Sequence, residues 1–188
     1  MDGPTLFRRA FHVASPLFLA YYILPDPLGR DIPRMSAALL FLGTAGCVEI
    51  ARIALGVKLF GMRRYEGNRV SAYAQGMLGL AFGLFVIRDP RIVVPVFLGM
   101  AWVDPLSAYC RKSGRSRVIP AWAYFLLFLG TVILMNGFLP PDAVLVSAVA
   151  TVAAILVEGP KIPQVDDDLL MQVVPMTVLF VLVAALGL

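Results

Sequence analysis

The sequence predicts an all-α membrane protein in which several helices cross the bilayer. Of its 188 residues, 60% are hydrophobic and 15% are charged, whereas soluble domains are about 45 to 50% apolar and about 25% charged. The apolar residues gather into long runs with prolines near the run ends, which favours helices over the short alternating segments of a barrel. A single transmembrane domain over residues 1–188 is therefore expected.

Seven apolar runs mark the expected transmembrane helices. In chain order they are Phe11–Leu24, Ser36–Gly56, Val70–Ile87, Ile92–Cys110, Ala121–Leu139, Ala143–Val157 and Leu169–Leu188. Most approach the roughly 20 residues that one span requires, but the first and the sixth are shorter. Pro16 is expected to kink the first helix. The third run has small residues at helical spacing, which lets a neighbouring helix approach closely. They are Ala72, Gly76, Gly79 and Gly83.

Lysine and arginine residues are divided unequally between the loops. If the seven runs alternate across the membrane, one side holds Arg8, Arg9, Lys58, Arg63, Arg64, Arg69, Arg111, Lys112, Arg115, Arg117 and Lys161. The other side holds Arg30, Arg34, Arg88 and Arg91, and Arg52 falls inside a run. Basic loops stay in the cytoplasm, so the amino terminus is expected there. Membrane orientation thus explains the net charge of +4 without a nucleic-acid surface.

Three charged residues fall inside the apolar runs, where an ionised group costs about 2.5 to 3.5 kcal/mol on insertion scales. Glu49 and Arg52 are three residues apart, so they form either a local ion pair or part of a polar site. Asp104 has no partner on its own helix before Arg111, so another helix, a metal or a cation must meet its charge. Asp104, Ser107 and Arg111 are spaced i, i+3 and i+7, which places an acid, a hydroxyl and a guanidinium on one helix face.

Further charged groups fall on the same, cytoplasmic half of the expected bundle. They are Arg8, Arg9, His12, Glu66, Glu158, Lys161 and the run Asp166–Asp168. Carboxylate oxygens bind Mg²⁺ while arginine and lysine balance phosphate charge, so this mixture indicates a site for Mg²⁺ and a polyphosphate. Acids at the start of the last run also complement a helix dipole, which is an alternative explanation for one or two of the three aspartates.

Five short motifs follow one another along the chain. They are Arg8-Arg9-x-x-His12; Glu49-x-x-Arg52; Arg63-x-x-Glu66 with Tyr73 and Gly76 downstream; Asp104-Pro105-Leu106-Ser107 with Arg111, Lys112 and Gly114; and Glu158 with Asp167, Asp168, Leu169 and Pro175. In this order they resemble motifs of the CTP-dependent lipid kinases, the group of dolichol kinase, phytol kinase and diacylglycerol kinase, which are related to phosphatidate cytidylyltransferases. The resemblance covers nearly the whole chain.

The resemblance implies a kinase that transfers the γ-phosphate of CTP to the hydroxyl of an isoprenoid, such as a polyprenol or dolichol, or of a related lipid alcohol. It implies Mg²⁺ ligands at Asp104, Asp167, Asp168 and Glu158, and nucleotide-binding groups at Arg63, Arg64, Arg111, Lys112 and Lys161. Glu49 or His12 would orient or deprotonate the alcohol beside the catalytic Asp104. Arg52, Glu66 and Ser107 would support the site.

Two other functions use the same residues. One is cytidylyl transfer onto a lipid phosphate, which breaks the bond at the α-phosphate instead. The other is a small transporter with Glu49, Arg52 and Asp104 as a substrate relay, although the one-sided charges and the absence of recognisable repeats count against it. The expected partners are the bilayer, a lipid alcohol and a nucleoside triphosphate, and the expected location is a prokaryotic plasma membrane with the site on its cytoplasmic side.

Overall fold

The protein is all-α, as the sequence predicts. A computed structural model describes residues 3–29, 31–63, 66–67, 69–158, 162 and 164–187. These residues form seven α-helices, and strand pairing among them is limited to one bridge between Leu28 and Ile32. The chain divides into two compact units, Met1–Met77 and Leu78–Leu188. Compact units are not the same as independently folding domains, so the single-domain expectation stays a prediction.

The first unit holds two helices and the beginning of a third. They are α1 (Gly3–Ala14) with a 3₁₀ continuation over Ser15–Tyr22, α2 (Arg34–Ala54) and the first turns of α3 (Ala72–Phe82). Helix α1 begins at Gly3 rather than at the expected Phe11, because Pro4 suits the first turn of a helix. The chain changes from α to 3₁₀ geometry at Ser15, directly before Pro16, where the sequence predicted a kink.

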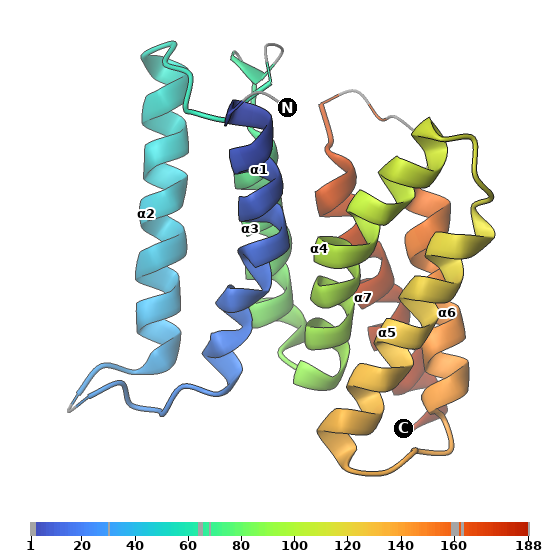
Figure 1. Ribbon diagram of the computed structural model, residues 1–188. Coiled ribbons are helices and arrows are strands. Elements are labelled where there is room, and N and C mark those ends of the chain that lie inside the picture. Colours follow the sequence, from blue (N-terminus) through green and yellow to red (C-terminus); the bar gives the residue numbers. More distant parts are fainter. Residues whose placement is uncertain are drawn as a thin grey trace. The chain divides into compact units, whose positions relative to one another are not determined.

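The second unit is built around four helices that enclose one core. They are α4 (Pro90–Lys112), α5 (Val118–Asn136), α6 (Ala143–Glu158) and α7 (Asp167–Leu186), preceded by the end of α3 and its π-helical continuation Gly83–Ile87. Both α4 and α6 pack against α5 and α7. Figure 1 shows that helices adjacent in the chain run in opposite directions. The last turns of α4 and α6 and the first turn of α7 therefore lie at the same end of this core.

Four helices, α2, α4, α5 and α7, are long and apolar enough to cross a membrane. Helix α6 and the α3 segment up to Ile87 are apolar but shorter. The buried residues of α2 are Glu49 and Arg52, whereas large apolar side chains such as Leu40 and Ile50 are exposed on it. An exposed apolar face of this kind suits contact with lipid. These features suggest a multi-pass membrane protein, and the number of seven spans with a cytoplasmic amino terminus stays a prediction.

Glycines allow close helix packing in the second unit, as the small-residue pattern predicts. A Cβ atom on Gly79 would lie 2.5 Å from Oε1 of Gln172, and one on Gly83 would lie 2.9 Å from Cγ1 of Val93. A side chain at either position would force the neighbour to move. A Cβ atom on Gly76 would meet no described atom within 4 Å. The close approach is therefore confirmed at Gly79 and Gly83.

Candidate functional site

One end of the second unit gathers polar side chains from three helices. Helix α4 supplies Asp104, Ser107 and Arg111 from its last turns, α6 ends at Glu158, and α7 begins after the N-cap Asp166. These segments are far apart in the sequence, but they meet because the helices run in alternating directions (Figure 1). The predicted face of α4 thus becomes one wall of a polar cluster.

Glu158 links α6 to α4. The hydroxyl of Ser107 donates a hydrogen bond to Oε2 of Glu158 over 2.5 Å, and Nη1 of Arg111 forms an ion pair with Oε1. The same Nη1 also donates to the backbone carbonyl of Glu158 at 3.1 Å. Glu158 and Ser107 are 6% and 2% exposed. The Ser107 hydroxyl thus satisfies Oε2 by a hydrogen bond, and the Arg111 guanidinium balances the charge of this buried carboxylate at Oε1 by an ion pair.

Asp104 and Asp168 form a second acidic group at this end. Their carboxylate oxygens lie within 4.8 Å of each other, and both side chains are half-buried. Two carboxylates at such a distance repel each other in a partly buried setting, so a cation between them lowers the energy of the pair. Helix α7 thus brings a second acid beside Asp104, and the prediction that another helix, a metal or a cation meets the charge of Asp104 stays a prediction.

The aspartates at the start of α7 occupy different positions and have different contacts. Asp166 is the N-cap, and its side chain accepts a hydrogen bond from the Asp168 amide. Helix capping therefore accounts for Asp166, the alternative that the sequence left open. Asp167 lies in the first turn, where it interacts electrostatically with Arg111.

Sequence reasoning missed Gln172 in α7, which is fully buried. Its Nε2 donates to the backbone carbonyl of Asp168 at 3.0 Å. An amide side chain one turn after Asp168, in a run whose other polar side chain is Thr177, was the available signal.

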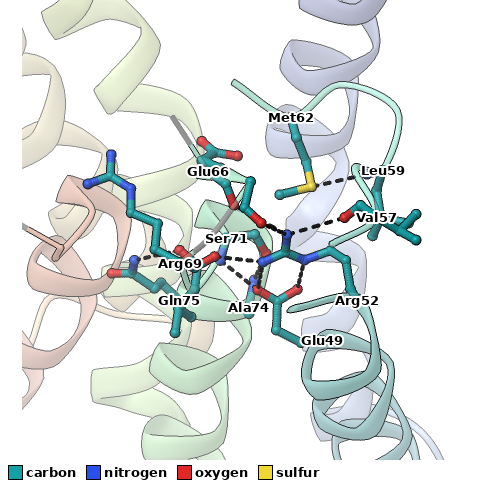
Figure 2. Close-up of polar contacts among 12 residues, drawn as sticks. Glu49, Arg52, Val57, Leu59, Met62, Glu66, Arg69, Ser71, Ala74 and Gln75 are labelled. Carbon is teal, nitrogen blue, oxygen red and sulfur yellow. Dashed lines mark hydrogen bonds and ion pairs between the residues drawn. The ribbon is translucent and has the colours of Figure 1, made fainter. Parts of the chain in front are cut away.

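In the first unit, Glu49 and Arg52 form a buried pair that holds the loop after α2 (Figure 2). Arg52 donates from Nε and Nη2 to the two carboxylate oxygens of Glu49 at 2.8 and 2.7 Å. Its Nη groups also donate to the carbonyls of Glu66, Gly67 and Arg69 at 3.2, 3.2 and 2.6 Å.

Both carboxylate oxygens of Glu49 are engaged. Besides the two bonds from Arg52, Oε1 of Glu49 accepts a hydrogen bond from the Ser71 amide at 2.6 Å. Of the two sequence interpretations, this geometry favours a local ion pair with a structural role.

Glu66 is the other buried acid of the first unit, at 2% exposure. Its Oε1 accepts a hydrogen bond from Nη1 of Arg8 at 3.2 Å, and its Oε2 accepts one from the Arg63 amide at 3.3 Å. These contacts tie α1 to the loop that Arg52 holds from the other side. Arg8 and Glu66 therefore support the loop conformation, and a role of Glu66 in supporting the site stays a prediction.

The remaining predicted residues are placed as follows. His12 is half-buried on α1 in the first unit, and its carbonyl accepts a hydrogen bond from the Ser15 hydroxyl at 2.8 Å. Lys112 is exposed at the end of α4, in the second unit. Arg64 and Lys161 lie outside the described residues.

Comparison of the chain with family models, curated proteins and solved structures found no match. The resemblance to CTP-dependent lipid kinases therefore rests on the five motifs alone. What the structure defines is a class: a helical protein with four helices long enough to cross a membrane and a cluster of acidic and basic side chains at one end of its four-helix core.

Proposed function

We propose that this protein is a membrane lipid kinase that transfers the γ-phosphate of CTP to the hydroxyl of an isoprenoid or related lipid alcohol. The approach of Asp104 to Asp168, at the end of α4 that carries Arg111 and Lys112, is the observation that carries the proposal. Acids beside arginine suit a complex of Mg²⁺ with a polyphosphate, because the acids bind the metal and the arginine binds phosphate oxygens. The order of the five motifs supports the same choice.

Asp104 and Asp168 fit a Mg²⁺ ion. Two oxygens in one octahedral shell, with bonds of about 2.0 to 2.1 Å, lie roughly 3 to 4 Å apart. The two carboxylates come within 4.8 Å of each other, so a small side-chain rotation brings an oxygen of each into one shell. Mg²⁺ bound there would neutralise negative charge on the phosphates. Asp167 is the next candidate ligand, because it begins the same helix as Asp168.

Arg111 and Lys112 are the proposed phosphate-binding groups of the second unit. In the transfer, the lipid oxygen forms a bond to the γ-phosphorus, the bond from that phosphorus to the β–γ bridging oxygen breaks, and CDP leaves. Charge is spread over the phosphate oxygens as this happens, and a guanidinium already held in place stabilises it without reorganisation. Arg63, on the exposed loop of the first unit, keeps its predicted role in nucleotide binding.

A base must take the proton of the lipid hydroxyl during the transfer. Of the two bases that the sequence predicts, Glu49 has both carboxylate oxygens engaged by Arg52 and Ser71. A carboxylate held in this way is a weak base, because protonation would break strong charged hydrogen bonds. His12 is the candidate base that we retain, since a histidine changes its protonation state near neutral pH.

The proposed orientation agrees with the substrates. At the end of the four-helix core that holds the acids are four basic residues, Arg111, Lys112, Arg115 and Arg117, and positive-inside sorting supports a cytoplasmic location for this end, on the side where CTP would be available. The tail of the lipid alcohol would lie in the bilayer, between or beside the helices, and its hydroxyl would extend to the end of the core that holds the acids. Apolar side chains exposed on α5, such as Leu126, suit such a lipid environment.

CTP labelled at either the α- or the γ-phosphorus tests the proposal. The purified full chain is incubated in detergent with Mg²⁺, labelled CTP, and either a prenol or a lipid phosphate. Transfer of the γ-label to the prenol is the expected result. Transfer of the α-label to the lipid phosphate would show a cytidylyltransferase instead. Transfer of neither label would overturn both enzyme proposals and leave transport or scaffolding as the remaining functions.

A further inference from the structure

Glu158 differs in its surroundings from the two aspartates proposed to bind Mg²⁺. Asp104 and Asp168 are half-buried, whereas Glu158 is 6% exposed and has Ser107 on one carboxylate oxygen and Arg111 on the other. Mg²⁺ keeps several waters in its shell, so a carboxylate that is 6% exposed and already has a partner on each oxygen is a poorer ligand than the half-buried aspartates. The contacts of the Glu158 carboxylate with Ser107 and Arg111 are those of a residue that fixes an arginine side chain.

Arg111 needs such an anchor because its side chain is long and 36% exposed. An arginine near the end of a helix loses side-chain entropy when it is fixed, and this loss weakens binding unless another contact has already fixed it. Glu158 provides two contacts, the carboxylate ion pair and the backbone carbonyl at 3.1 Å, and both involve Nη1 of Arg111. Nε and Nη2 of Arg111 have no hydrogen-bond partner among the described residues.

Ser107 completes the arrangement from within α4. It lies one turn before Arg111, and its hydroxyl holds the second oxygen of Glu158 at 2.5 Å. The carboxylate therefore cannot rotate freely about its last bond, and its Oε1 stays directed at Arg111. A guanidinium anchored through one nitrogen leaves an Nε–Nη2 edge, and such an edge matches two phosphate oxygens.

We propose that Glu158, fixed by Ser107, is a positioning residue that holds Arg111 ready to bind a phosphate group through its Nε and Nη2 atoms, and that Glu158 is not a metal ligand. The assignment replaces the metal-binding role expected for Glu158 from the sequence. The choice of CTP as the phosphate donor rests on the proposed function, but the positioning of Arg111 applies to any polyphosphate.

The test separates metal binding from phosphate binding. Mn²⁺ affinity is measured by electron paramagnetic resonance, and the affinities for CTP and for inorganic tripolyphosphate are measured by calorimetry, all on the full chain in detergent. Glu158→Gln should weaken binding of both phosphate compounds about tenfold, while the Mn²⁺ affinity stays within about twofold of the unmodified protein. Asp168→Asn should do the reverse and weaken Mn²⁺ binding at least about tenfold.

Ser107→Ala is a second variant that is less prone to misfold, because it keeps the ion pair of Arg111 with Glu158 and removes one hydrogen bond. It should weaken tripolyphosphate binding by a smaller factor, about two- to fivefold, and it should have little further effect in an Arg111→Ala background. Arg91→Gln, at the opposite end of α4, is the matched control and should change neither affinity.

Two results would overturn the proposal. One is a loss of Mn²⁺ binding in Glu158→Gln as large as that in Asp168→Asn, which would make Glu158 a metal ligand. The other is unchanged tripolyphosphate binding in both Glu158→Gln and Ser107→Ala. Weakened tripolyphosphate binding in a protein that transfers no label from CTP would support the positioning role and defeat the kinase proposal alone.

Discussion

The two units each contain a buried glutamate paired with an arginine, and the pairs differ in how many donors of the arginine bind protein. In the first unit, Arg52 is 3% exposed and its nitrogens donate to Glu49 and to loop carbonyls. In the second unit, the protein contacts of Arg111 with Glu158 all involve Nη1. An arginine whose donors all bind protein stabilises the fold, whereas one with donors left over is able to bind a ligand.

The partners of the two glutamates point in the same direction. Glu49 accepts hydrogen bonds from Arg52 and from a backbone amide at Ser71, so it connects α2 to the start of α3. Glu158 connects two helices of the second unit and stands at the end where Asp104 and Asp168 approach each other. Two arginine–glutamate pairs of similar chemistry therefore indicate different roles once the remaining donors of each arginine are counted.

The largest effect is expected from removing Arg52. Arg52→Ala leaves Glu49 as a buried, uncompensated charge and deprives several loop carbonyls of their donor, which should cost about 3 to 5 kcal/mol of stability. Reversible denaturation in detergent, followed by circular dichroism, measures this loss. Glu49→Gln serves as the companion variant and should cost less, because a neutral amide still accepts from Arg52. A change below about 1 kcal/mol in Arg52→Ala would show that the pair does not hold the loop.

Replacing Asp104 should separate activity from stability. Asp104→Ala removes a ligand of the proposed Mg²⁺ ion, and phosphate transfer should fall on the order of 10²- to 10³-fold. Its melting temperature should stay close to that of the unmodified protein, so that the loss of transfer does not reflect a loss of the fold. The γ-label assay and a thermal melt are carried out on the same preparation. Full transfer activity in this variant would rule out Asp104 as a ligand of the catalytic Mg²⁺ ion.

The sequence predicted the helices well because their boundaries depend on local signals. Apolar run length, the N-cap residues Asp89 and Asp166, and a proline such as Pro90 after the cap all act within a few residues. The exception is the start of α1, where the apolar run begins later than the helix. Arg8 and Arg9 interrupt the apolar pattern, so the pattern did not predict the first turns of α1, although neither residue disfavours a helix.

The candidate site was predicted only as far as one helix face. The spacing of Asp104, Ser107 and Arg111 placed these side chains together, but it did not show that Glu158 would bind two of them. Contacts between helices depend on how α4 and α6 are packed, and a shift of one turn would bring a different residue opposite Ser107. The hydrogen bonds of Arg52 to loop carbonyls could not be predicted either, because every residue has a backbone carbonyl and residue type does not indicate which one accepts a hydrogen bond.

Replacing Arg111 by lysine should sharpen the contrast with Arg52. A lysine keeps the positive charge but lacks the planar guanidinium, so it has no Nε–Nη2 edge to match two phosphate oxygens while a third nitrogen holds Glu158. The KM for CTP should rise about tenfold, which corresponds to about 1.4 kcal/mol. The stability should change little, since the side chain is 36% exposed. Steady-state kinetics and a thermal melt check the two parts. A large loss of stability with an unchanged KM would place Arg111 with Arg52 among the structural arginines.

The smallest effect is expected at Arg91, which is the most exposed of the three arginines compared. Arg91 pairs with Asp89 at 3.0 Å, but its side chain is 59% exposed, against 1% for Arg52. Water solvates both charges of an exposed pair, so Arg91→Gln should change the stability by about 0 to 1 kcal/mol. The same denaturation experiment as for Arg52 measures it. If Arg91→Gln instead destabilised the protein as strongly as Arg52→Ala, the burial of the guanidinium would not be what separates the pairs. The number of guanidinium donors left without a protein partner would then not distinguish structural from ligand-binding arginines in this chain.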